Sequence, residues 1–204
     1  MPSFQSGGAF LPTADYDIRG SWAMANPAID SLKANASVAQ VTGAFAADTY
    51  LAGSSIAIPS PTGYLAKARY LAKFDMVKTA AGVGAFTVTL RIGTGGVVGD
   101  TAIAAMAFAA GTAAADTGTF AVDAVFRTVG GGTSAVVVAT ISCTHALAAT
   151  GLISTGASGN GQITTVSSGF DSTIANTIIG LSVNGGAAFS GTNNYVYAEL
   201  HSFL

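Results

Sequence analysis

The sequence has little charge. Only 9% of its 204 residues are Asp, Glu, Lys or Arg, against about 25% in typical soluble domains, and the formal net charge is -2. Nucleic acid is not expected as a partner, because phosphate binding needs clustered Lys and Arg side chains. Free monomers are normally kept apart by surface charge, so this composition indicates a subunit whose surface is largely covered by neighbours.

Cysteine and histidine are scarce as well. The single cysteine, Cys143, excludes an intrachain disulfide and a cysteine-only zinc site. His145 would share a strand face with Cys143, but the sequence shows no residue that would orient such a couple. Cys143 is therefore expected to be a small core residue. Glu199 and His201, two residues apart, are interpreted as a surface pair, since a metal site needs more ligands.

Catalytic motifs are missing or incomplete. Residues 156–160 (GASGN) lack the final glycine of the G-x-S-x-G nucleophile elbow. Residues 93–98 (GTGGVV) fail the dinucleotide-binding pattern, and no helix is expected after them. No pair of acidic residues has the context of a glycosidase acid/base couple, although distant carboxylates can meet in space. We expect no enzymatic activity, no cofactor and no metal.

No long apolar helix is expected. The most membrane-like stretch, residues 134–153, contains several Ser and Thr residues, follows a Gly-Gly-Gly run and lacks flanking positive charges. Its Val and Ala content favours a long buried strand, so no membrane partner is predicted. The N-terminus has neither the basic region nor the apolar run of a secretory signal, which predicts synthesis in the cytoplasm without a signal peptide.

Alternating apolar and polar residues predict β-strands from residue 41 onward. The best example is 64–76, where Tyr70 and Phe74 fall on one face and Arg69 and Lys73 on the other. The other expected strands are 40–46, 49–58, 86–92, 101–109, 120–127, 134–146, 162–167, 174–183 and 192–203. Gly-rich turns separate them, which predicts an all-β, jelly-roll-like β-sandwich over residues 41–204.

Residues 1–40 have a different character. They contain three of the five prolines and the only tryptophan, and they show no sustained alternation. This segment is predicted to be an extended N-terminal arm, with a possible short helix that begins after Asn26 and includes residues 28–35. Aromatics that a segment cannot bury itself are expected to bury on a partner. The candidate anchors are Phe4, Phe10, Tyr16, Arg19 and Trp22.

Several runs resemble segments of tailed-bacteriophage structural proteins. They are 41–59 (VTGAFAADTYLAGSSIAIP), 70–82, 86–94, 113–120, 126–130, 169–173 and 178–186. The resemblance is spread over roughly residues 40–200 without a single diagnostic motif, and the N-terminal arm lies outside it. It implies a jelly-roll-like virion module of the kind found in capsid cement proteins, head fibres and tail or receptor-binding proteins.

The resemblance leads to a first interpretation, a capsid cement (decoration) protein. It would bind the major capsid protein on the outside of the virion and stabilise the shell, as a homotrimer. The alternative is a tail-fibre or receptor-binding protein for host attachment, whose loops would bind host glycan or protein. Aromatic candidates for such a glycan site are Tyr50, Tyr64, Tyr195 and Tyr197. The third hypothesis is an enzyme, a depolymerase.

Overall fold

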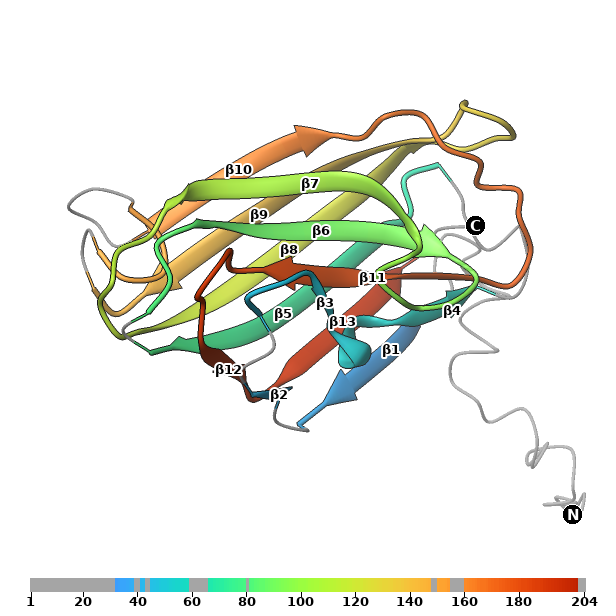
Figure 1. Ribbon diagram of the computed structural model, residues 1–204. Helices are drawn as coiled ribbons and strands as arrows, with labels where there is room; N and C mark the ends of the chain where they lie inside the picture. The colour runs from blue at the N-terminus through green and yellow to red at the C-terminus, as the bar shows by residue number, and fades with distance from the viewer. Residues whose placement is uncertain are drawn as a thin grey trace, which may run out of the picture.

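The structure is a computed structural model that describes residues 32–38, 41–42, 45–58, 66–79, 81–147, 150–154 and 160–201. Two antiparallel β-sheets pack face to face (Figure 1). The elements are β1 (Leu32–Ser37), β2 (Val41–Thr42), β3 (Thr49–Tyr50), η1 (Ala52–Ser54), β4 (Ile56–Ile58), β5 (Arg69–Lys78), β6 (Ala85–Gly93), β7 (Thr101–Ala110), β8 (Asp116–Thr128), β9 (Val136–His145), β10 (Asn160–Val166), β11 (Thr177–Asn184), β12 (Gly191–Asn193) and β13 (Val196–His201).

The larger sheet has the strand order β1-β13-β5-β8-β9-β10, with β12 paired to β5 and β2. The smaller sheet has the order β3-β11-β6-β7, with β4 also paired to β11. The chain crosses between the sheets several times, so β5 lies between β13 and β8, and β6 lies beside β11. Neighbours distant in sequence and antiparallel pairing are typical of jelly-roll-like sandwiches, and the expected all-β fold is confirmed.

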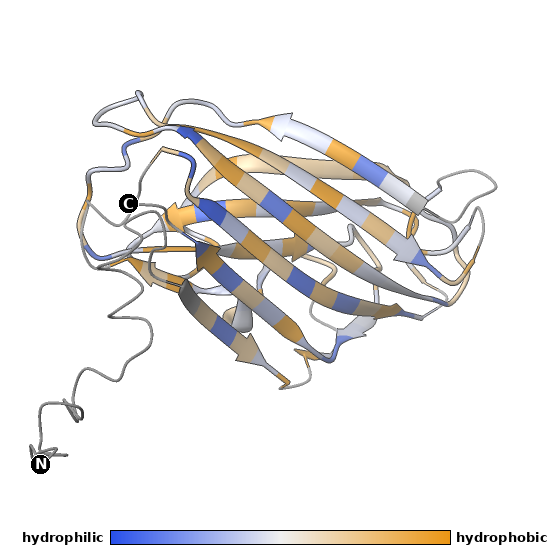
Figure 2. Ribbon diagram, turned by 180° about the vertical axis from the view of Figure 1, so that it is seen from behind, coloured by the Kyte–Doolittle hydropathy of each residue, from blue (hydrophilic) through white to orange (hydrophobic). Residues whose placement is uncertain are grey.

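Strand alternation places the core. Along β5, buried side chains such as Tyr70 and Phe74 alternate with outward ones such as Arg69 and Lys73. Figure 2 shows the outer side of the large sheet, where hydrophilic bands recur along neighbouring strands. The predicted alternation is confirmed from Arg69 onward, but the strand begins there and not at Tyr64, because Ala66 and Lys67 form a turn.

Three stacked phenylalanines join the two sheets. Phe74 and Phe120 are direct cross-strand partners in the large sheet, with ring centroids 5.0 Å apart. Phe86 of the small sheet lies 4.7 Å from the Phe120 ring, so Phe120 contacts aromatic rings from both layers. Phe108 adds an edge contact at 5.8 Å. Aromatic contacts of this kind stabilise a core beyond the burial of apolar area alone.

The N-terminal boundary differs from the prediction at residue 40. Residues 32–37 form β1 and pair along their whole length with β13. Residues 32–35, the second half of the expected helix, are therefore strand, because an edge position on the sheet satisfies their backbone. Residues 1–31, with the five candidate anchors, lie outside the described residues.

Most other expected strands are present, with shifted ends. Residues 134–146 contain β9, whose inward residues are buried in the core and whose outward residues are partly exposed, as expected for a strand and not for a membrane helix. Segments 40–46 and 49–58 are broken into β2, β3, η1 and β4, because a turn at residues 45–47 and the η1 turn interrupt them. No helix in the described part of the chain is long and apolar enough to cross a membrane.

Candidate functional site

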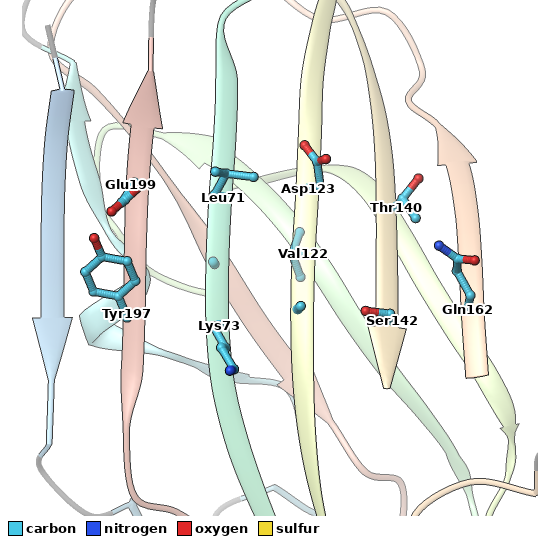
Figure 3. Close-up of a pocket in the computed structure, with 11 residues that line it drawn as sticks. Leu71, Lys73, Val122, Asp123, Thr140, Ser142, Gln162, Tyr197 and Glu199 are labelled. Atoms are coloured by element: carbon cyan, nitrogen blue, oxygen red, sulfur yellow. The ribbon is translucent and has the colours of Figure 1, made fainter. Parts of the chain in front are cut away.

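The outer face of the large sheet has a shallow hollow of about 450 Å³ (Figure 3). It crosses β13, β5, β8, β9 and β10, and most of its lining residues occupy outward positions of these strands, whereas Ala72 and Val122 are buried residues at its floor. The outward lining residues are Leu71, Lys73, Ala121, Asp123, Thr140, Ser142, Gln162, Tyr197 and Glu199. The side chains fall into two adjacent rows that follow the register of the ladder.

The first row, here called the polar row, runs through Tyr197, Lys73, Ala121, Ser142 and Gln162. Each residue is the direct cross-strand partner of the next. Within the described part of the chain, the four polar side chains of this row form no hydrogen bond or ion pair with other residues. Tyr197 is 42% exposed. The row therefore presents polar groups whose hydrogen-bonding capacity is open to solvent.

The second row, here called the paired row, runs beside it through Glu199, Leu71, Asp123, Thr140 and Thr164. Its polar groups are occupied. Asp123 accepts two hydrogen bonds from the Arg69 guanidinium, one of them at 2.7 Å, and Thr140 and Thr164 hydroxyls lie 3.0 Å apart. In the paired row, the hydrogen-bonding groups of Asp123, Thr140 and Thr164 are therefore already engaged with other side chains.

The Glu199–His201 pair has the role that the sequence suggested. Glu199 Oε2 lies 2.7 Å from His201 Nε2, and both side chains are partly exposed on the outer face of β13. The two residues share a face because they are two apart on a strand. Glu199 forms one end of the paired row, and Glu199 and His201 are a surface pair, as expected.

A carboxylate positions the strand that carries Tyr197. Asp75 Oδ1 accepts hydrogen bonds from the backbone N–H groups of Asn194 (2.7 Å) and Tyr195 (3.0 Å). Asp75 Oδ2 accepts a bond from the Asn194 amide at 2.7 Å, and Asn193 donates to the Asp75 carbonyl at 2.8 Å. These bonds hold the β12–β13 connection against β5. No motif in the sequence had indicated this role for Asn193 and Asn194.

A buried Asp–His pair is a second feature that was not predicted from the sequence. Asp116 and His145 are both fully buried at their side chains, with Oδ2 and Nδ1 2.6 Å apart. Asp116 also accepts bonds from the backbone N–H groups of Thr117 (2.8 Å), Leu152 (3.0 Å) and Leu147 (3.2 Å). A partner that orients His145 therefore exists, contrary to the expectation.

Lys78 completes this buried polar cluster, whose members are Lys78, Asp116 and His145. Lys78 Nζ donates to the carbonyls of Thr112 and Gly151, the latter at 3.1 Å. Gly151 has φ +94°, and a Cβ there would collide with the Asp116 carboxylate, so only glycine suits this position. The cluster joins the ends of β5, β8 and β9 to Gly151 and Leu152, and all three of its residues are buried.

Cys143 is a core residue, as predicted. Its side chain is buried between the sheets, and burial raises the pKa of the Cys143 thiol to about 12. The thiol therefore stays protonated at neutral pH and cannot serve as a nucleophile, since the thiolate is the reactive form. His145 shares its face, as expected, and bonds with Asp116.

The pKa of Asp116 is lowered in the folded protein. Burial alone would raise it, but hydrogen bonds from Leu152, His145, Thr117 and Leu147 to the carboxylate outweigh that effect. Because the pKa of Asp116 is lower in the folded protein than in an unfolded chain, these bonds stabilise the fold above the ordinary pKa of an aspartate. The stabilisation is lost as the pH falls through the folded pKa. We therefore expect the contribution of Asp116 to the free energy of unfolding to decrease as the pH falls below about 4. In Asp116→Asn, urea titrations from pH 2 to 7 should show a flatter acid slope, and an unchanged slope would contradict this assignment.

A second hollow, of about 430 Å³, lies between the β6–β7 loop and the segment that leads into β11. Its two carboxylates are already used by the backbone. Asp100 accepts bonds from the N–H groups of Gly95, Gly96 and Val97, and Asp171 accepts a bond from Gly132 N–H at 3.0 Å. These contacts shape the Gly-rich loops at residues 93–100 and 130–134, so the carboxylates are structural.

The four tyrosines proposed for a glycan site have different surroundings. Tyr197 lies at the end of the polar row. Tyr50 is half-buried, its hydroxyl lies 3.4 Å from Ser55 Oγ, and burial raises its pKa. Tyr195 is half-buried beside Asp75, and Tyr64 lies outside the described residues. The structure therefore brings only Tyr197 of the described three into the hollow.

No protein-family model matches the sequence, and no curated protein matches it significantly. Among solved structures, the chain is similar to the lectin UEA-II complexed with galactose, at 15% identity and a TM-score of 0.42, and to lectin II from Ulex europaeus, at 14% and 0.41. Each match covers 84% of this chain and 92% of the lectin.

The chain is also similar to the CBM2 module of the evolved Dit protein of Lactobacillus casei BL23 phage J-1. That match has 12% identity and a TM-score of 0.33, and it covers 72% of this chain and 68% of the module. Galactose is a ligand of the first of these lectins. Similarity this low carries no information about a ligand of this chain. What the structure itself shows is an all-β, antiparallel, jelly-roll-like sandwich.

Proposed function

We propose that this chain is a non-enzymatic structural protein of a tailed-phage virion, a cement protein that binds the outside of the major capsid shell and stabilises it. The proposal rests on a contrast within the sequence, between the residues of the sandwich and the aromatic-containing segment before them. Described residues from Phe45 to Leu200 fill the core between the two sheets. The phage resemblance coincides with this sandwich, and the aromatic-rich residues 1–31 precede it.

The proposed mechanism is burial of aromatic side chains on capsid subunits. Phe4, Phe10, Tyr16 and Trp22 are the anchors, and Arg19 supplies a polar contact. Each buried aromatic would contribute on the order of 1.5–3 kcal/mol. In a homotrimer, three linked segments would add avidity, because the later binding steps become intramolecular. The charge-poor surface of the sandwich suits a subunit that sits among neighbours.

Deletion of residues 2–24 tests the anchors. We expect the truncated chain to keep its far-UV circular dichroism spectrum and melting behaviour but to lose binding to capsids that lack the protein. The full chain with Tyr197→Ala is the matched control, because Tyr197 lies on the sandwich and should not affect capsid binding. Co-sedimentation with purified capsids measures the outcome, and full binding by the truncated chain would contradict the proposal.

A host-attachment role, as a tail-fibre or receptor-binding protein, is the second candidate. The open polar row with exposed Tyr197 favours it, since exposed polar and aromatic side chains on a rigid sheet suit ligand binding. Copy number separates the two roles. Several hundred copies over the head, measured by quantitative gel or cryo-EM of purified virions, support the cement role, whereas a few copies at the tail support attachment.

A further inference from the structure

We propose that the hollow on the outer face of the large sheet is a binding groove for a neutral oligosaccharide. The inference deepens the host-attachment candidate, but it concerns the isolated sandwich and does not depend on where the protein sits in the virion. It uses the sheet face, in contrast to the loops that the sequence analysis considered for host binding.

The polar row supplies open hydrogen-bonding groups of both kinds. The Tyr197 and Ser142 hydroxyls and the Gln162 amide can each donate and accept, and the Lys73 ammonium donates. None of these side chains is engaged with another residue in the described chain. Sugar hydroxyls also donate and accept, so this set matches a polyhydroxylated ligand better than a ligand with acceptors alone.

The length and floor of the groove suit an extended ligand. The polar row crosses five adjacent strands, and four steps between neighbouring strands span about 19 Å. Ala121 lies at the middle of the row, where its short side chain leaves room between Lys73 and Ser142. Such a groove would accept several consecutive sugar rings and is too long and open for a single monosaccharide.

Tyr197 supplies the apolar part of the site. Its ring stands at one end of the row, 42% exposed, on a strand held by the Asp75 hydrogen bonds (Figure 3). A tyrosine combines a flat apolar body with a polar tip. The C–H face of a sugar ring can pack on that body while its hydroxyls bond to the rest of the row.

The charge of the groove favours a neutral ligand. Asp123 is paired with Arg69, and Glu199 is hydrogen-bonded to His201. Lys73 is the one charged side chain in the lining without a paired partner among the described residues. A polyanion would need clustered cations. An extended peptide could not add as a strand here, because the backbones of β5, β8 and β9 are paired on both sides.

The test uses the full chain and an array of defined neutral oligosaccharides, of about one to six units, built from glucose, galactose, mannose, rhamnose or N-acetylglucosamine. Isothermal titration calorimetry then measures the ligands that bind. We expect at least one series to bind, with affinity that rises with length until the groove is filled. Tyr197→Ala and Gln162→Ala should each weaken binding about tenfold or more, whereas Tyr197→Phe should retain most of it.

Thr144→Ala is the matched control, because Thr144 is exposed on the same face of β9 but does not line the hollow. Its affinity should equal that of the unaltered chain. The proposal would be overturned if no oligosaccharide series bound. It would also be overturned if the Tyr197→Ala and Gln162→Ala variants bound with the same affinity as the unaltered chain. Salt-sensitive binding to heparin alone would also overturn it, because the groove would then be an anion site. The capsid co-sedimentation result is independent of all these outcomes.

Discussion

Asp116→Ala is expected to lower the free energy of unfolding by about 3–5 kcal/mol, because several buried hydrogen-bond donors lose their acceptor. The carboxylate accepts bonds from His145 and from three backbone N–H groups. Its loss leaves these donors buried without an acceptor, and it removes the opposite charge that favours the ammonium form of Lys78. Urea unfolding, monitored by far-UV circular dichroism, measures this loss of stability.

Asp123→Ala is the matched control for this experiment. Asp123 also forms a carboxylate ion pair, with Arg69, but both side chains are over a third exposed. Exposed ion pairs contribute about 0–1 kcal/mol, so the control should unfold near the original urea concentration. If both variants lost the same stability, the buried polar cluster would have no special role in joining Leu147, Gly151 and Leu152 to the sheet.

Phe120→Ala is the second large effect, with an expected loss of about 3–5 kcal/mol. Phe120 is fully buried, and its ring contacts Phe74, Phe86 and Phe108. The alanine would leave a cavity at the point where the two sheets meet. The surrounding rings belong to three different strands in addition to β8, so they cannot all move inward to fill it.

The control for Phe120→Ala is Val166→Ala, an apolar truncation at a residue that is 52% exposed at the end of β10. This change should alter stability by no more than about 0.5 kcal/mol. Equal urea midpoints for the two variants would contradict the central role given to the phenylalanine stack. A changed denaturant slope in Phe120→Ala would instead indicate an altered denatured or native state, or loss of two-state unfolding.

The strands were predictable because their signal is local. In β5, β6 and β8, alternate side chains point to opposite faces, and the sequence shows that alternation directly. Edge strands were harder to predict from the sequence. Leu32–Ser37 has weak alternation and was assigned to the arm, yet it is a strand because β13 offers an unpaired edge. A strand on an edge depends on its neighbour more than on its own pattern.

The buried cluster had a partial signal in the sequence. The Gly-rich turn at residues 130–134 predicts a hairpin of β8 and β9, and counting outward from it brings residues near 116 opposite residues near 146. A register shift between Phe126 and Thr128 changes that count by one residue. A one-residue slip moves a side chain to the other face, so the Asp116–His145 contact required the actual pairing.

The sequence by itself determined the all-β class, the position of the main strands, the core role of Cys143 and the Glu199–His201 surface pair. These features depend on residues that are close together in the chain. Only the tertiary structure decided the polar row and the buried polar cluster. Tyr197, Lys73, Ser142 and Gln162 are distant in sequence and become neighbours because β13, β5, β8, β9 and β10 pair in that order. Strand order arises from non-local pairing, which no local pattern of side chains specifies.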